Sequence, residues 1–81
     1  MNAMLEINQK VQFKKGPFTD ILGEGQTYTV TAVYQKGDDT DYGDTYNGSE
    51  PLYRIEADGE GCPKPLRVLY ETENSIRPAN A

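Results

Sequence analysis

The sequence has 81 residues, with 13 acidic and 8 basic side chains, one cysteine and no histidine, and its formal net charge is −5. The lack of histidine excludes the usual Ser-His-Asp and Cys-His forms of catalysis, and a single cysteine can form no internal disulfide. One cysteine and no histidine also disfavour an all-protein structural zinc site, and the acidic balance disfavours direct binding to nucleic acid or to an anionic membrane. We therefore expect no metal ion and no cofactor.

The length suits one domain over residues 1–81. No apolar run approaches the ~20 residues that cross a bilayer. The first residues lack the basic and apolar regions of a signal peptide, and the lone cysteine fits a reducing compartment. These features predict a soluble cytoplasmic protein.

Alternating apolar side chains predict the first strand, because no stretch repeats apolar residues every 3.6 positions as a long helix would. Residues 11–13 are its firm part, and residues 8–10 form a bend that leads into it. Residues 14–25 contain a Gly-Pro pair and two further glycines, which is typical of a long loop. We expect the apolar side chains of this loop to fold back onto the sheet. They are Phe18, Ile21 and Leu22.

The best strand signal covers residues 26–35, which are rich in β-branched and aromatic side chains. One face carries tyrosine, valine and alanine, and we expect it to face the core because threonine dominates the other. A β-bulge would instead bring Val33 inward, and this alternative stays open. The residues of the expected core face are Tyr28, Val30, Ala32 and Tyr34.

The second half predicts three more strands. Residues 52–57 alternate apolar and charged side chains, and residues 66–71 place Leu66, Val68 and Tyr70 on one face. Residues 58–65 between them hold two glycines and two prolines, which predicts a turn-rich connection. Residues 72–75 form one tight turn before a last short strand that Pro78 ends.

Five strands with this spacing resemble the SH3-like small barrel. The resemblance covers nearly the whole chain and is one of layout, not of motif. It implies an all-β fold: a small five-stranded SH3-like barrel with a short 3-10 turn before the last strand. Many unrelated functions use this fold, so it implies no activity.

Two narrower resemblances concern function. Residues 10–16, 53–57 and 67–77 are faintly similar to the plasmid-encoded type II dihydrofolate reductases, tetramers whose active pore is lined by a Val-Gln-Ile-Tyr strand. The matching stretch here is Arg67-Val68-Leu69-Tyr70. Leu69 stands at the glutamine position, so that activity is not carried over. Peptide-binding SH3 domains also present acids and aromatics on loops, but this chain lacks their tyrosine-rich opening segment and their paired tryptophans.

The segment from residue 37 to residue 50 carries five acids and no base, which equals the whole net charge. It also holds three glycines and two tyrosines, the composition of an exposed loop between strands. Tyrosine offers a large, stiff contact surface, and flanking acids would steer a basic partner. The opposite reading, that Tyr42 or Tyr46 folds down over the barrel, is equally open.

We therefore predict a non-catalytic interaction module, a small bacterial or mobile-element accessory protein that binds a protein or peptide, most naturally a basic one. The expected binding residues are Asp38, Asp39, Asp41, Tyr42, Asp44 and Tyr46. Two alternatives remain. One is an oligomeric enzyme subunit with a site at a symmetry axis, built from Arg67, Leu69 and Tyr70. The other is an acidic decoy of nucleic acid that would also use Glu56, Asp58 and Glu60. The sequence leaves the oligomeric state open.

Three further features have simple readings beside functional ones. Asp39 to Asp44 is similar to half of a calcium loop, but charge repulsion that keeps a solvated loop extended explains it as well. Cys62, two residues before Lys64, is either a reactive thiol or a loop cysteine without a role. Glu56 and Glu71 are expected on outward faces, where Arg54 and Arg67 would pair with them in a surface ladder.

Overall fold

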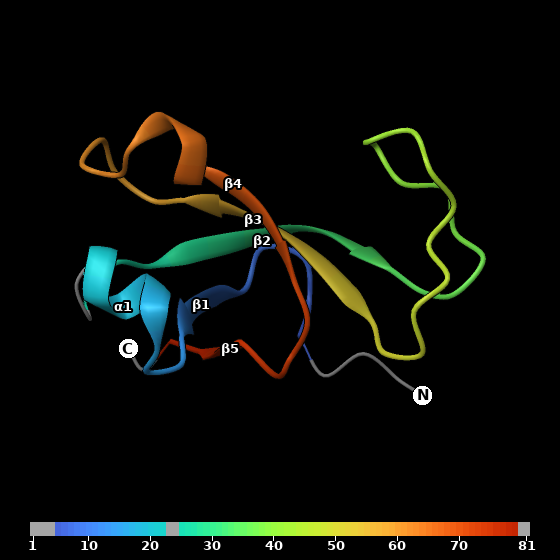
Figure 1. The fold of residues 1–81 in the computed structure, drawn as a ribbon, viewed down its shortest axis with the longest axis horizontal. Helices are drawn as coiled ribbons and strands as arrows, with labels where there is room; N and C mark the ends of the chain where they lie inside the picture. Colours follow the sequence, from blue (N-terminus) through green and yellow to red (C-terminus); the bar gives the residue numbers. More distant parts are fainter. Residues whose placement is uncertain (1–4, 23–24, 80–81) are drawn as a thin grey trace.

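The computed structural model describes residues 5–22 and 25–79, without the side chains of Phe18 and Leu22. Its strands form one antiparallel sheet in the order β4-β3-β2-β1-β5, with one short helix and one 3-10 helix beside it (Figure 1). The elements are β1 (Lys10–Phe13), α1 (Pro17–Leu22), β2 (Tyr28–Tyr34), β3 (Leu52–Ala57), η1 (Lys64–Leu66), β4 (Val68–Glu71) and β5 (Ile76–Pro78). The fold class is therefore all-β, as predicted.

The last strand returns to the first, because β5 pairs antiparallel with β1. The ladders among the described residues leave β4 and β5 as the two edges of the sheet, so the sheet curls without closing into a barrel. The tight turn expected before the last strand is present, with the Ser75 N–H donating to the Thr72 carbonyl at 3.1 Å. The 3-10 helix η1 stands one connection earlier, before β4.

The region predicted as one long loop contains the six-residue helix α1. Proline suits a first helical position, and the Thr19 hydroxyl accepts from the Gly16 N–H at 2.9 Å while donating to the Gly16 carbonyl at 2.8 Å. Ile21 is 66% exposed, so the prediction that it folds back onto the sheet was wrong. The side chains of Phe18 and Leu22 lie outside the described residues. None of the described helices is long and apolar enough to cross a membrane.

A β-bulge in β2 corrects the expected core face. Val30 pairs with Ile55 on β3, but Arg54 on β3 pairs with Ala32, so one extra residue is accommodated between them. Because side chains alternate along a strand, the extra residue reverses the alternation beyond it. Val33 packs against the core, as the bulge alternative predicted. Ala32 and Tyr34 were expected in the core but belong to the outer face.

The core lies between the curled halves of the sheet and buries two tyrosines completely, Tyr28 and Tyr53. Each hydroxyl has an acceptor: Tyr28 donates to the Leu66 carbonyl and Tyr53 to a carboxylate oxygen of Glu73, both at 2.7 Å. Burial raises the pKa of Tyr28, so its hydroxyl stays protonated. The core cluster is Leu5, Val11, Phe13, Tyr28, Val30, Tyr53, Ile55, Cys62 and Ile76.

Cys62 belongs to this core and is 5% exposed. Its sulfur lies 3.5 Å from the Tyr28 hydroxyl oxygen and 3.4 Å from the Leu66 carbonyl oxygen. A buried thiol of this kind behaves as a small apolar side chain that also fills space. The structure therefore gives Cys62 a packing role that the sequence did not predict.

The two faces of β4 separate Leu69 from Tyr70, which the enzyme alternative had placed in one site. Leu69 lies opposite Ile55 and packs against the core, whereas Tyr70 lies opposite Arg54 on the outer face. Glu71 lies opposite the buried Tyr53, so the expectation that it faces outward was wrong. Burial raises the pKa of Glu71, and a hydrogen bond with Ser75 opposes that rise.

Candidate functional site

The acidic segment folds into an ordered hairpin-like loop that projects beyond the ends of β2 and β3 (Figure 1). The Gly37 N–H donates to the Tyr46 carbonyl at 2.8 Å, and the Tyr46 N–H donates to the Asp38 carbonyl at 2.9 Å. An isolated bridge joins Asp39 and Thr45. The loop is therefore held by backbone hydrogen bonds across its two arms. We call residues 37–50 the acidic loop.

Asp41 fastens the acidic loop to the outer face of the sheet. Its Oδ1 accepts hydrogen bonds from the hydroxyls of Tyr34 at 3.0 Å and Tyr70 at 2.6 Å. Its Oδ2 lies 2.9 Å from Nε of Arg54. The hydrogen bond from Tyr70 holds the pKa of Asp41 below its usual range; the hydrogen bond from Tyr34 and the charge of Arg54 add to this effect, against partial burial. These four residues are the Asp41 cluster.

Arg54 neutralises two acids at once. Its guanidinium also donates from one terminal nitrogen to Thr31 Oγ1 at 2.7 Å and to Glu56 Oε2 at 2.5 Å. The hydrogen bond to Glu56 raises the pKa of Arg54 further, so the guanidinium stays charged. The surface ladder predicted across the β3–β4 hairpin is not formed by these four residues: Glu56 contacts Arg54 of its own strand, and Arg67 donates to the Gly59 carbonyl.

The two tyrosines of the acidic loop have different fates. Tyr42 stays 47% exposed and meets the ring of Tyr70 edge-on, with 4.9 Å between ring centroids and 84° between planes. Tyr46 is half-buried, and its hydroxyl donates to the Glu50 carbonyl. Tyr42 therefore stays on the surface, whereas Tyr46 folds down and supports the loop.

The remaining acids of the predicted site are exposed and lie on the loop itself. Asp38 Oδ2 accepts from the Gln35 N–H at 2.7 Å, and Asp39 Oδ1 accepts from the Thr45 hydroxyl at 3.2 Å. Within residues 5–22 and 25–79, no three acidic or cysteine side chains come together as ligands for a metal ion. The carboxylates thus form a spread negative surface and do not converge on a point.

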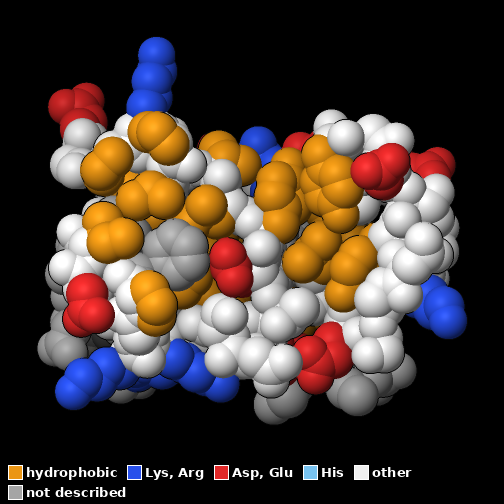
Figure 2. Space-filling model, in the orientation of Figure 1, with side chains coloured by type: hydrophobic (Ala, Val, Ile, Leu, Met, Phe, Trp, Pro, Cys, Tyr) orange, Lys and Arg blue, Asp and Glu red, His pale blue; other side chains and the backbone are white. Residues whose placement is uncertain are grey.

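Three members of the Asp41 cluster were not among the predicted binding residues. Tyr34 was assigned to the core, because the bulge that turns it outward leaves no clear sequence signal. Tyr70 was predicted on the same face as Val68, which the structure confirms, but Leu66, predicted on that face too, lies in η1 and packs against the core. Arg54 was expected to pair with a strand neighbour and not with the loop. Figure 2 shows two groups of hydrophobic side chains on the face that β4 crosses, with one acidic side chain between them and others towards the edges of the view.

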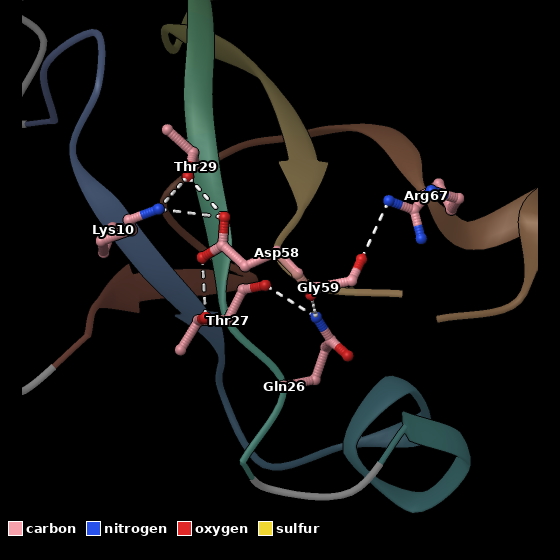
Figure 3. A network of polar contacts seen from close by, with 7 residues as sticks. All are labelled: Lys10, Gln26, Thr27, Thr29, Asp58, Gly59 and Arg67. Atoms are coloured by element: carbon pink, nitrogen blue, oxygen red, sulfur yellow. Dashed lines mark hydrogen bonds and ion pairs between the residues drawn. The ribbon is translucent and has the colours of Figure 1, made fainter. Parts of the chain in front are cut away.

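A second polar network lies at the opposite end of the sheet and surrounds Asp58 (Figure 3). Asp58 accepts hydrogen bonds from the hydroxyls of Thr27 and Thr29, both at 2.7 Å, and forms an ion pair with Lys10 at 3.0 Å. Burial raises the pKa of Asp58, but these three partners outweigh it and the net pKa is lowered. Hydrogen bonds and an ion pair with residues of the same chain thus already engage the Asp58 carboxylate.

Adding a methyl group at Gly48 should displace Tyr46. A Cβ atom at this position would overlap with the hydroxyl end of the Tyr46 ring, which must then swing out and lose its hydrogen bond to Glu50. We expect the Gly48→Ala protein to fold with Tyr46 exposed, which NMR would detect as a shift of its ring resonances towards free-tyrosine values. The control is Gly61→Ala, whose Cβ would meet nothing within 4 Å. An unchanged Tyr46 signal in Gly48→Ala would contradict the packing described.

Comparison of the chain with protein-family models, with curated proteins and with solved structures gave no match in any of the three. What defines this protein is therefore its fold and its surface: an open five-stranded antiparallel sheet with an acidic loop that carries an exposed aromatic residue.

Proposed function

We propose that this protein is a non-catalytic interaction module that docks a basic protein or peptide segment on Tyr42 and the exposed acids beside it. The observation that carries the proposal is the placement of Tyr42. Its ring is exposed, yet it rests edge-on against Tyr70, whose hydroxyl is held by Asp41. A contact residue that is already ordered loses little conformational entropy on binding.

The charges around Tyr42 favour a cationic partner. Arg54 neutralises Asp41, but Asp38, Asp39 and Asp44 are exposed and meet no basic side chain within ion-pair distance among the described residues. Exposed carboxylates near an aromatic contact raise the rate of encounter with a basic segment more than they raise the final affinity. The strand order, with the last strand paired to the first, supports the resemblance to SH3-like modules.

The chemistry of the Asp41 cluster supports a binding role and not a catalytic one. The hydrogen bond between the Tyr70 hydroxyl and Asp41 is the main cause that raises the pKa of Tyr70, so the hydroxyl stays neutral and remains a donor. The Asp41 carboxylate already accepts two hydrogen bonds and forms an ion pair with Arg54. No observation favours the enzyme alternative, because Leu69, one of its expected site residues, packs against the core. None favours the nucleic-acid decoy either, because Asp58 is paired with Lys10.

Selection from a random peptide library on the immobilised protein tests this function. We expect the recovered peptides to be rich in lysine and arginine. Tyr42→Ala should weaken their binding about 5- to 30-fold at every salt concentration, which corresponds to about 1–2 kcal/mol for an interface aromatic. Asp44→Asn should weaken binding mainly at low salt, because salt screens exposed charges.

Matched controls are available on the far side of the molecule. Ile21→Ala removes an exposed apolar side chain from α1, and Glu60→Gln removes an exposed acid from the β3–β4 connection. Both should bind the selected peptides like the original protein. Peptides without basic residues, or binding that tolerates Tyr42→Ala, would refute the proposed function.

A further inference from the structure

The two edges of the sheet differ in their capacity to accept another strand. An edge strand presents unpaired N–H and C=O groups that can pair with a further chain, and proline blunts such an edge because it has no N–H. At the β5 edge, Lys10 pairs with Ala79, and alternation then places the outward backbone groups on Ile76 and Pro78. Proline therefore removes one of the two donors of that edge.

The β4 edge keeps both of its donors. The Ala57 N–H donates to the Arg67 carbonyl at 2.8 Å, which fixes the alternation of the β3–β4 ladder. Leu69 then exchanges hydrogen bonds with β3, while the N–H and C=O groups of Val68 and Tyr70 point away from it. Within the described chain, no backbone hydrogen bond uses these outward groups.

This open edge is continuous with the proposed docking surface. The side chains of Val68 and Tyr70 lie on the outer face, where Val68 is 38% exposed and Tyr70 carries the ring of Tyr42. A strand paired with β4 would place its alternate side chains beside these two residues. One of them would thus lie next to the Tyr42 and Tyr70 rings, where a cation is favoured both by the aromatic faces and by the acidic loop.

We propose that the partner segment binds in extended form, as an added strand along the free edge of β4. Basic side chains stand at alternate positions of this strand, and one of them lies over Tyr70. This inference rests on the proposed function and specifies its geometry. The occupant is a segment of another protein and not a second copy of this chain. Each copy has a net charge of −5, so pairing β4 with β4 would bring two acidic loops to one side of a joint sheet.

A blocked peptide that alternates arginine with threonine is the probe. Two variants carry backbone N-methyl groups, one on every arginine and the other on every threonine. In a strand, the amides of one set face β4 and those of the other set face solvent. We expect one methylated variant to lose binding at least tenfold and the other to bind within about twofold of the parent, as measured by calorimetry. Equal binding of both variants would overturn strand addition.

Amide hydrogen exchange of the protein gives an independent readout. The parent peptide should slow exchange at Val68 and Tyr70 about tenfold or more, while Leu69, already bonded to β3, should change little. If the peptide binds through Tyr42 but these amides exchange as before, the proposed function stands and the strand geometry fails. If light scattering shows a dimer with Val68 and Tyr70 protected before peptide is added, a second copy occupies the edge and this inference is wrong. Absence of peptide binding refutes a basic extended occupant, and the library selection then decides the proposed function separately.

Discussion

Replacing Ile55 with alanine should lower the free energy of unfolding by about 2–5 kcal/mol. Ile55 is fully buried in β3 and lies between Val30 on one side and Leu69 on the other. The loss combines the transfer of buried methylene and methyl groups with the cavity that remains, because neighbouring strands relax only in part. A chain of this length has a total stability of about 4–12 kcal/mol, so the change removes a large share of it.

Urea unfolding followed by circular dichroism measures this effect as a lower transition midpoint. The matched control is Ile21→Ala, the same substitution at a site that is 66% exposed on α1, and it should change the free energy of unfolding by no more than about 0.5 kcal/mol. Equal midpoints for the two variants would show that β3 is not the centre of the core.

Replacing Asp58 with alanine should lower the free energy of unfolding by about 1–3 kcal/mol at neutral pH. Asp58, which follows β3, joins the β3–β4 connection to β1 and to the start of β2, since it accepts from Thr27 and Thr29 and pairs with Lys10 (Figure 3). Its side chain is 30% exposed, so water replaces part of what the substitution removes and keeps the effect below that of Ile55→Ala.

The effect of Asp58→Ala depends on pH in a defined direction. The folded state lowers the pKa of Asp58 below its ordinary value of 3.8, so the stabilisation is complete above that value and is lost as pH falls through the folded pKa. The difference in urea midpoint between the original protein and the variant should therefore be largest near pH 7 and shrink below about pH 4. The control is Glu60→Ala, which removes an exposed acid from the same connection. It should change neither the urea midpoint nor the dependence of that midpoint on pH. A difference that persists unchanged in acid would assign the stabilisation to something other than the ionised carboxylate.

The candidate site was predictable in part. The charge run and the two tyrosines drew attention to the acidic loop, and its exposure could be read directly from composition. Composition could not show that the acids of this loop make different contacts. Asp41 looks like its acidic neighbours in the sequence, but Arg54 and Tyr70 come from strands that follow it by many residues, and only folding brings them to its carboxylate.

Sequence alone determined the chemical limits and the strand plan of this protein. The lack of histidine, the single cysteine and the acidic balance bound its chemistry, and alternating side chains located the strands because that alternation is a local property of an extended backbone. The tertiary structure decided which way particular side chains point. One extra residue in β2 turned Tyr34 outward and Val33 inward, and the pairing of β4 with β3 placed Glu71 beside a buried tyrosine. Register between strands is set by contacts distant in sequence, so a local pattern cannot determine it.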